Sequence, residues 1–380
     1  MTKQQRSSLP TGWEPVRAAD QVMDQLIPIC EPSVKGAHDA DFVIAGGKAY
    51  VVYEANDIQP GEAASWTFVY AVMSIIDLQT NTVERIIRFA ESEQAYDNET
   101  LPVGACFVPR IIRKDANTLR CFFVSEHPEV REGQTWYIDY RIDQTKFDTC
   151  IYKAKLKTPE GLFDMQPYVF YRYASDRGYT GKAKNFGLYL VDSFKSFENR
   201  TYAVLNNYPI GQNGLTVLNE QMDTFEMIGV FHEPGHMRLT EASVNRLPDG
   251  TWRAITRCDN GDCNYAFAES RDGIQWTPHK QRPPVVAGSN SKPTFDRFNG
   301  LYYLGWQDAE KVGEVGRSIF NLDISEDGEH WERKYRFESE KSFQYPVFKQ
   351  ADGAVYVAVT RGDHSASRKE YIAFGKLEDL

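Results

Sequence analysis

The chain has 380 residues, of which 13% are aromatic, and it carries a formal net charge of −10 at pH 7. An acidic chain with no basic stripe is not expected to bind nucleic acid, because it offers no surface that would neutralise phosphates. No run of about 18 apolar residues occurs, so we expect no membrane span and no membrane partner.

The first ten residues, Met1–Pro10, are polar and lack the apolar core of a signal peptide. We therefore expect a cytoplasmic protein, or a periplasmic or secreted one if a leader was removed ahead of this sequence. The six cysteines are spaced neither as a small disulfide framework nor as a zinc site, although Cys258 and Cys263 are close enough to pair or to stay reduced in a turn. We expect no metal and no other cofactor, and the sequence does not indicate an oligomeric state.

Strand signals dominate along the whole chain. Ala49–Glu54, Leu119–Val124 and Val355–Thr360 are rich in β-branched and aromatic residues, and Gly, Asp or Asn bounds each of them. No long stretch shows the 3.6-residue apolar period of an amphipathic helix. The sequence therefore predicts an all-β protein.

A repeat is visible in the order of strands and turns. Its unit is an apolar strand, a turn such as Asp-Gly or Asn-Gly, a second apolar strand, and a third that ends in a tight Asp turn followed by Trp. Copies begin near residues 40, 109, 185, 242, 293 and 346. A four-stranded propeller blade takes about 40 to 50 residues, and blades stacked around an axis cover faces that one blade cannot bury. We predict one domain over residues 1–380, a six-bladed β-propeller, with a five-bladed propeller as the alternative.

Two short segments nearly coincide. Ser270–Trp276 and Ser325–Trp331 both read Ser-x-Asp-Gly-x-x-Trp. In such a segment the Asp accepts hydrogen bonds from turn N–H groups, the Gly supplies a positive φ, and the Trp packs beneath the turn. The pattern resembles the Asp box of sialidases and related propellers, in a form one residue shorter. The resemblance implies a structural role for both segments.

Three segments of the second half resemble sialidase segments and keep the order of that family. The first runs from Glu241 to Arg257, with a glutamate at its start and an arginine of the family's carboxylate-binding triad at its end. The second, Gly316–Ser325, carries a later triad arginine, Arg317. The third, Ser342–Phe348, carries the nucleophilic tyrosine, Tyr345. The resemblance covers roughly residues 241–360 and implies that these side chains meet in a pocket at the propeller axis.

The chemistry of the family explains these residue types. Guanidinium groups hold a carboxylate in forked hydrogen bonds, so Arg257 and Arg317 are expected to bind an acidic group of a sugar. The substrate's carboxylate would repel a carboxylate nucleophile, whereas a neutral tyrosine that is activated by a glutamate avoids this repulsion. The resemblance thus implies Tyr345 as the nucleophile or transition-state stabiliser and Glu241 as its partner.

The first half matches the family loosely. Phe107 stands where the first triad arginine of the family lies, so a complete three-arginine clamp is not evident. Arg110 is nearby, but strand alternation points it to the other face unless the strand is shifted. The early segment around residues 38–42 and the histidine at 127 supply the remaining candidates.

Two carboxylates and two histidines complete the candidate site. Asp39 or Asp41 is expected to be the general acid, unless both belong to a solvated turn at a blade edge. His38 and His127 are expected to contact the substrate.

Three functions are compatible with this pattern. We favour an exo-acting, sialidase-like glycoside hydrolase whose partner is a carbohydrate. The first alternative is a polysaccharide lyase, because some propellers resemble ulvan lyases, in which Arg neutralises a uronate and His or Tyr removes the α-proton. The second is a propeller that binds glycans without catalysis.

Overall fold

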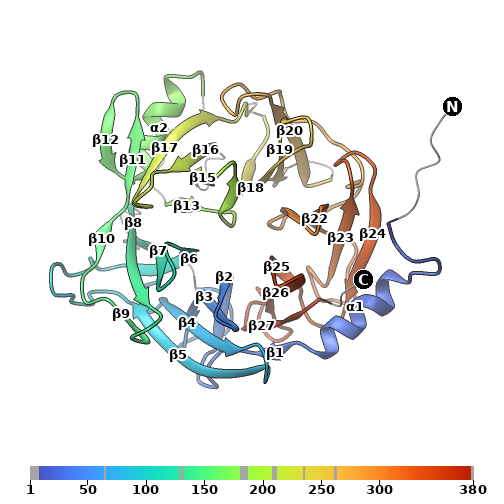
Figure 1. Cartoon of the computed structure of the whole chain (residues 1–380), viewed down its shortest axis with the longest axis horizontal. Coiled ribbons are helices and arrows are strands. Elements are labelled where there is room, and N and C mark those ends of the chain that lie inside the picture. The colour runs from blue at the N-terminus through green and yellow to red at the C-terminus, as the bar shows by residue number, and fades with distance from the viewer. Residues whose placement is uncertain are drawn as a thin grey trace.

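The computed structural model describes residues 8–63, 66–127, 129, 132–179, 187–207, 212–233, 236–260 and 263–377. Strands dominate, and the only helices among these residues are α1 (Pro15–Asp24) and α2 (Pro167–Ser175). The sheets stand around a central axis (Figure 1). The architecture is an all-β propeller, which confirms the predicted class. No helix in the described part of the chain is long and apolar enough to cross a membrane.

The first half of the chain supplies three sheets. The first is formed by β2 (Gly36–Ala45), β3 (Lys48–Asn56), β4 (Tyr70–Asp77) and β5 (Thr82–Ala90). The second is formed by β6 (Ala105–Arg113), β7 (Thr118–Glu126), β8 (Gly133–Arg141), β9 (Lys146–Phe147) and β10 (Tyr152–Lys153). The third is formed by β11 (Lys155–Thr158), β12 (Gly161–Asp164), β13 (Leu188–Leu190), β14 (Lys195–Phe197), β15 (Arg200–Asn207), β16 (Gln212–Leu218) and β17 (Thr224–Val230).

The second half supplies the remaining sheets. One is formed by β18 (Leu239–Arg246), β19 (Trp252–Cys258) and β20 (Tyr265–Ser270). The next is formed by β21 (Thr294–Phe298), β22 (Leu301–Gln307), β23 (Ile319–Ser325) and β24 (Glu332–Glu338). The last is formed by β25 (Gln344–Ala351), β26 (Ala354–Arg361), β27 (Tyr371–Lys376) and the N-terminal β1 (Ile27–Pro28). Because β1 pairs with β27, the start of the chain closes the ring.

The prediction of six blades is wrong, and the alternative prediction of five blades fits the structure better. Among the described residues five sheets have four strands or more, whereas the sheet β18–β20 has three. In place of a fourth strand, the segment after β20 makes isolated bridges, Lys280 with Phe267 and Gly288 with Asp308. Pro278, Pro283 and Pro284 interrupt this segment, and proline has no N–H group to donate to a ladder.

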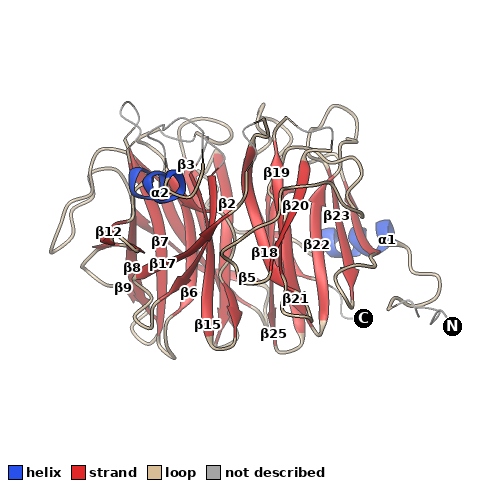
Figure 2. Ribbon diagram, turned by 90° about the horizontal axis from the view of Figure 1, so that it is seen from above, coloured by secondary structure: helices blue, strands red, loops and turns tan. Residues whose placement is uncertain are grey.

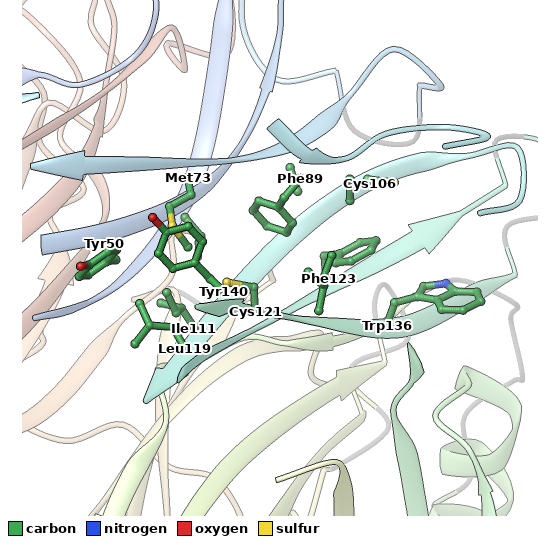
Figure 3. Close-up of a cluster of buried hydrophobic side chains, with 14 of the residues drawn as sticks. Tyr50, Met73, Phe89, Cys106, Ile111, Leu119, Cys121, Phe123, Trp136 and Tyr140 are labelled. Atoms are coloured by element: carbon green, nitrogen blue, oxygen red, sulfur yellow. The ribbon is translucent and has the colours of Figure 1, made fainter. Parts of the chain in front are cut away.

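The apolar core lies between neighbouring sheets. In one cluster, Met73 and Phe89 of the first sheet pack with Phe123, Trp136 and Tyr140 of the second (Figure 3). The ring centroids of Phe89 and Phe123 are 5.9 Å apart, in an edge-to-face arrangement. The aromatic residues of this chain therefore serve largely to cover one blade with the next.

The two Ser-x-Asp-Gly-x-x-Trp segments fold alike. Oδ1 of Asp272 accepts hydrogen bonds from the backbone N–H groups of Ile274 (2.8 Å) and Gln275 (2.9 Å), and Gly273 has a φ of 77°. Oδ1 of Asp327 accepts the equivalent bonds in the second copy. Both segments are thus tight turns.

The sequence left open whether Cys258 and Cys263 pair. In the structure both are free thiols.

At the end of the ring where the candidate site lies, the innermost strands of four sheets are irregular. The pairing register shifts between His38 and Asp41 in β2, between Phe107 and Arg110 in β6, between Leu239 and Ala242 in β18, and between Gln344 and Val347 in β25. Such bulges re-aim side chains relative to the regular alternation of a strand. The strands run roughly along the axis, so that their ends gather on two opposite sides of the ring (Figure 2).

Candidate functional site

Three side chains from separate strands meet beside the axis. The hydroxyl of Tyr345, near the start of β25, donates a hydrogen bond to Oε1 of Glu241 in β18 at 2.6 Å. Nη1 of Arg257, near the end of β19, lies 2.8 Å from Oε2 of Glu241 and 2.9 Å from the hydroxyl oxygen of Tyr345. With Arg317 and His38, described below, these residues form what we call the axial cluster.

The backbone aims two of these side chains at the axis. Tyr345 has a φ of 50° and lies in the bulge of β25, and Glu241 lies in the bulge of β18. A positive φ is unusual for a bulky residue, and such strain concentrates at functional sites. The local backbone irregularity is therefore what brings a tyrosine and a glutamate from different blades into contact.

Both arginines are held in place by neighbouring groups. Nε of Arg257 donates to Oδ1 of Asp259 at 2.6 Å. Arg317, which precedes β23, donates to Oε1 of Gln344 at 3.0 Å and to the carbonyl oxygen of Asn290. Its guanidinium carbon lies 6.0 Å from the centroid of the Tyr345 ring. Two positioned guanidinium groups thus flank the tyrosine.

Tyr345 and Glu241 have complementary protonation states. Burial and the adjacent Glu241 carboxylate raise the pKa of Tyr345 well above its ordinary value, although Arg257 and Arg317 oppose the shift. Burial by itself would raise the pKa of Glu241, but Arg257 and the hydrogen bond from Tyr345 outweigh it and hold that pKa below the ordinary value. At neutral pH the tyrosine is a neutral donor and the glutamate is an ionised acceptor.

His38 packs against the same tyrosine. The two ring centroids are 4.3 Å apart, and Nδ1 of His38 lies 3.0 Å from Oγ1 of Thr360. Burial lowers the pKa of His38 well below its ordinary value, and nearby cations, Lys369 foremost, lower it further. The imidazole is therefore neutral, and its buried Nε2 has no hydrogen-bond partner among the described residues.

Comparison with solved structures defines the fold. A protein of unknown function from Dyadobacter fermentans aligns with a TM-score of 0.67 at 12% identity, over 97% of this chain and 99% of that one. Trypanosoma rangeli sialidase in complex with sialic acid aligns with a TM-score of 0.62 at 12% identity, over 98% of this chain and 60% of that one. The Hadza microbial sialidase Hz136 aligns with a TM-score of 0.62 at 12% identity, over 90% of this chain and 66% of that one.

The fold is a sialidase-like β-propeller. This chain spans less than two thirds of the length of either sialidase. No protein-family model matches the sequence, and a search of curated proteins finds no match.

In this sialidase-like propeller, the expected acid Asp39 is an ion-pair partner. Both of its carboxylate oxygens lie 3.0 Å from Nη2 of Arg110, and Oδ1 also accepts a hydrogen bond from Nζ of Lys292. Burial alone would raise the pKa of Asp39, but Arg110 and Lys292 hold it below the ordinary value. A carboxylate that binds its proton so weakly is a poor general acid.

Arg110 and Asp41 have structural partners as well. The side chain of Arg110 is 1% exposed and directs its remaining donors to carbonyl oxygens, including that of Pro109 at 2.7 Å. Asp41 is fully buried and accepts hydrogen bonds from the N–H of Ile111 (3.2 Å) and the hydroxyl of Ser193 (2.9 Å). These contacts link three inner strands or loops, and they do not support Arg110 as a substrate ligand or Asp41 as the acid.

His127 follows β7, and its Nδ1 accepts a hydrogen bond from the N–H of Glu129 at 3.2 Å. Phe107, at the position of the missing arginine, is buried and packs edge-to-face on Tyr189, with centroids 5.4 Å apart. The position of Phe107 therefore supplies no cation to the site.

The sequence analysis did not identify four ionisable residues near the axial cluster. Lys292 and Lys369 lie 4.9 and 5.5 Å from the centroid of the Tyr345 ring. Glu62 forms an ion pair with Lys369, and its side chain is 28% exposed. Glu54 is buried in β3 opposite His38. Glu54 could have been identified from the sequence, because it is a glutamate at the end of an apolar strand. The two lysines and Glu62 lie in segments that show no strand or turn pattern.

Glu54 holds a proton at neutral pH. Burial raises its pKa to about 8, and the neighbouring carboxylates Glu62 and Asp39 add to the shift. Oε2 of Glu54 accepts a hydrogen bond from the N–H of Val108 at 2.9 Å. The site therefore contains one neutral carboxyl group, one partly exposed carboxylate beside it, and the ionised Glu241.

Proposed function

We propose that this protein is an exo-acting glycoside hydrolase that cleaves an acidic sugar by way of a tyrosine nucleophile. The observation that carries the proposal is the 2.6 Å hydrogen bond from the neutral Tyr345 hydroxyl to the ionised Glu241, with Arg257 and Arg317 on either side. A base in contact with a nucleophile, oriented by a third group, is the arrangement that nucleophilic catalysis requires.

The reaction follows in two steps. Glu241 takes the phenolic proton as the oxygen of Tyr345 bonds to the anomeric carbon, and the bond from that carbon to the leaving oxygen breaks. Water then attacks the same carbon and gives a proton back to the group that protonated the leaving oxygen. The bond from that carbon to the oxygen of Tyr345 breaks, the sugar is released, and Glu241 returns the phenolic proton to the tyrosine. Double displacement of this kind retains the anomeric configuration.

The leaving oxygen needs a proton donor, and we assign this role to Glu62 with Glu54 behind it. Glu54 retains a proton to about pH 8 and holds it beside Glu62. The partly exposed Glu62, which forms an ion pair with Lys369, relays that proton from Glu54 to the leaving oxygen. Asp39 is replaced in this role because its two cationic partners favour the ionised form.

The cations around Tyr345 favour a substrate with a carboxylate. Arg257 and Arg317 supply the forked donors, and Lys292 and Lys369 add positive charge within 5.5 Å of the ring centroid. A neutral nucleophile suits this substrate because it is not repelled by the carboxylate that the cations attract.

The test is the Tyr345→Phe variant, assayed against a panel of aryl glycosides of acidic sugars. We expect turnover to fall by about 10³-fold or more while the melting temperature stays within a few degrees. The matched control is Tyr356→Phe, which removes the hydroxyl of a tyrosine in β26 that stacks on Phe374. Unchanged turnover in Tyr345→Phe would exclude the proposal.

His38 supports a second candidate, a lyase acting on a uronate. Its neutral Nε2, which has no hydrogen-bond partner among the residues that the structure describes, would remove the proton α to a carboxylate. The bond to the leaving oxygen then breaks and a carbon–carbon double bond forms. New ultraviolet absorbance of an unsaturated uronate identifies the lyase, and release of reducing sugar without it identifies the hydrolase. Thermal stabilisation by a glycan without any product identifies a binding protein.

A further inference from the structure

A cavity of about 450 Å³ lies between the third sheet and the sheet β18–β20, apart from the axial cluster. Its walls include three aromatic side chains, Tyr179, Phe231 and Trp276, which come from the segment after α2, the end of β17 and the first Ser-x-Asp-Gly-x-x-Trp turn. The ring centroids of Phe231 and Trp276 are 4.3 Å apart. The volume falls in the range of about 300–1,000 Å³ that small-molecule sites occupy.

Amide and carboxyl groups lie in the wall of the cavity. Asn213 donates to Oε1 of Glu233 through both its backbone N–H (2.8 Å) and its Nδ2 (2.6 Å). Burial raises the pKa of Glu233 well above its ordinary value in spite of these bonds, which favours the protonated carboxyl group. No hydrogen bond within the described residues uses Oε2, which leaves an O–H donor available at the cavity.

The nearest cation has a partner of its own. Arg177 lies 3.6 Å from the centroid of the Tyr173 ring and donates to the carbonyl oxygen of Tyr173 at 2.9 Å. The cavity wall also includes Gln212, whose side chain is 1% exposed and whose Nε2 has no partner among the described residues. The site therefore offers aromatic side chains, amide and carboxyl groups, and one guanidinium group, that of Arg177, which lines the cavity and is engaged by Tyr173.

We propose that this cavity binds a neutral sugar unit. A pyranose ring has an apolar face of C–H groups, which suits an aromatic wall, and a rim of hydroxyls, which suits amides and a protonated carboxyl. The one guanidinium group of the wall, that of Arg177, is stacked on Tyr173, whereas two guanidinium groups and two lysines lie around Tyr345 in the axial cluster. Buried donors without a partner, such as Nε2 of Gln212, raise the free energy of the empty protein, and a ligand hydroxyl relieves that cost.

The experiment is saturation-transfer NMR on the full-length protein with the methyl glycosides of glucose, galactose, mannose and N-acetylglucosamine as probes. The wild type is expected to transfer saturation to the C–H face of at least one glycoside. Tyr179→Ala is expected to weaken that binding by about tenfold, because a stacking face is lost. Glu233→Gln is expected to retain it, since an amide replaces a neutral carboxyl, whereas Glu233→Ala is expected to weaken it.

A variant of the axial cluster separates the two sites. Arg317→Ala is expected to leave the binding of the neutral glycoside unchanged, whatever its effect on catalysis. Tyr179→Leu, which keeps apolar volume, replaces Tyr179→Ala if the latter does not fold. The proposal is overturned if no glycoside of the panel receives saturation from the wild type, or if the signal survives both Tyr179 variants and is lost in Arg317→Ala.

Discussion

The hydroxyl of Tyr345 lies 2.6 Å from Oε1 of Glu241, although 104 residues separate the two in the chain. Each residue sits in a bulge of an inner strand, so the contact depends on two backbone irregularities in different blades. A neutral phenol and an ionised carboxylate in this geometry give the proposed nucleophile and its base.

Replacing the proposed proton donor tests the other half of the mechanism. Glu62→Gln is expected to lower kcat on substrates with a poor leaving group by about 10²–10⁴-fold. Aryl glycosides whose leaving group is a weak base need no protonation, and their turnover is expected to change little. Equal losses on both kinds of substrate would remove Glu62 from this role.

The carboxylate clamp is tested at Arg317. Arg317→Ala is expected to raise KM for an acidic glycoside by about 10- to 100-fold, because a charge-assisted hydrogen bond is lost. Arg317→Lys is expected to recover only part of this, since an ammonium group lacks the planar fork. The control is Arg297→Ala, which alters an exposed arginine over Tyr302. If Arg317→Ala binds the substrate as well as the control variant does, Arg317 does not bind the carboxylate of the substrate.

Glu54 gives the stability of the protein a defined pH dependence. Between its ordinary pKa of 4.5 and its folded pKa of about 8, the unfolded chain releases a proton that the folded protein retains. The contribution of Glu54 to the free energy of unfolding therefore falls as pH rises through this window, by about 5 kcal/mol, and is level above it.

Glu54→Gln cannot titrate and is expected to lack that fall. Urea unfolding at about pH 5 and about pH 9 measures the difference, with the exposed Glu226→Gln as the control. If the free energy of unfolding changes with pH in the same way in the wild type and in Glu54→Gln, Glu54 is ionised in the folded protein.

Asp39 is expected to matter for stability rather than for proton transfer. Asp39→Asn leaves the buried Arg110 and Lys292 without a counter-charge, and we expect a loss of about 3–5 kcal/mol at neutral pH. Because the folded pKa of Asp39 lies below its ordinary 3.8, the wild type gains this contribution above that pH and loses it as pH falls through the folded pKa. A variant as stable as the wild type at neutral pH would show that the ion pairs contribute nothing.

The sequence predicts the strands and the second-half cluster well, for a physical reason. Glu241, Arg257, Arg317 and Tyr345 each lie beside a recognisable strand or turn pattern, and the repeat order places such segments at neighbouring positions around an axis. The structure brings Glu241, Arg257 and Tyr345 into direct contact and places Arg317 6.0 Å from the tyrosine ring.

The site residues in the first half of the chain could not be predicted in this way, because residue patterns do not indicate where a strand has a bulge. Strand alternation assigns Arg110 to one face, but Val108 takes a φ of 52°, and the register shifts before Arg110. The same irregularity at Asp39, with a φ of 51°, brings it to Arg110 and Lys292. Side chains that reach the site from loops, such as Lys369, leave no periodic signal at all.

The pairing of β1 with β27 sets a condition on how this protein is made. Residues 27 and 28 are synthesised long before their partners, Phe374 and Ala373. The final sheet cannot be completed until β27 has been made, and until then the first and last blades each present an uncovered apolar face. Contacts so distant in sequence slow folding and prolong exposure to aggregation. Deletion of β1 or β27 is thus expected to impair solubility during expression more than it alters the chemistry of the finished ring.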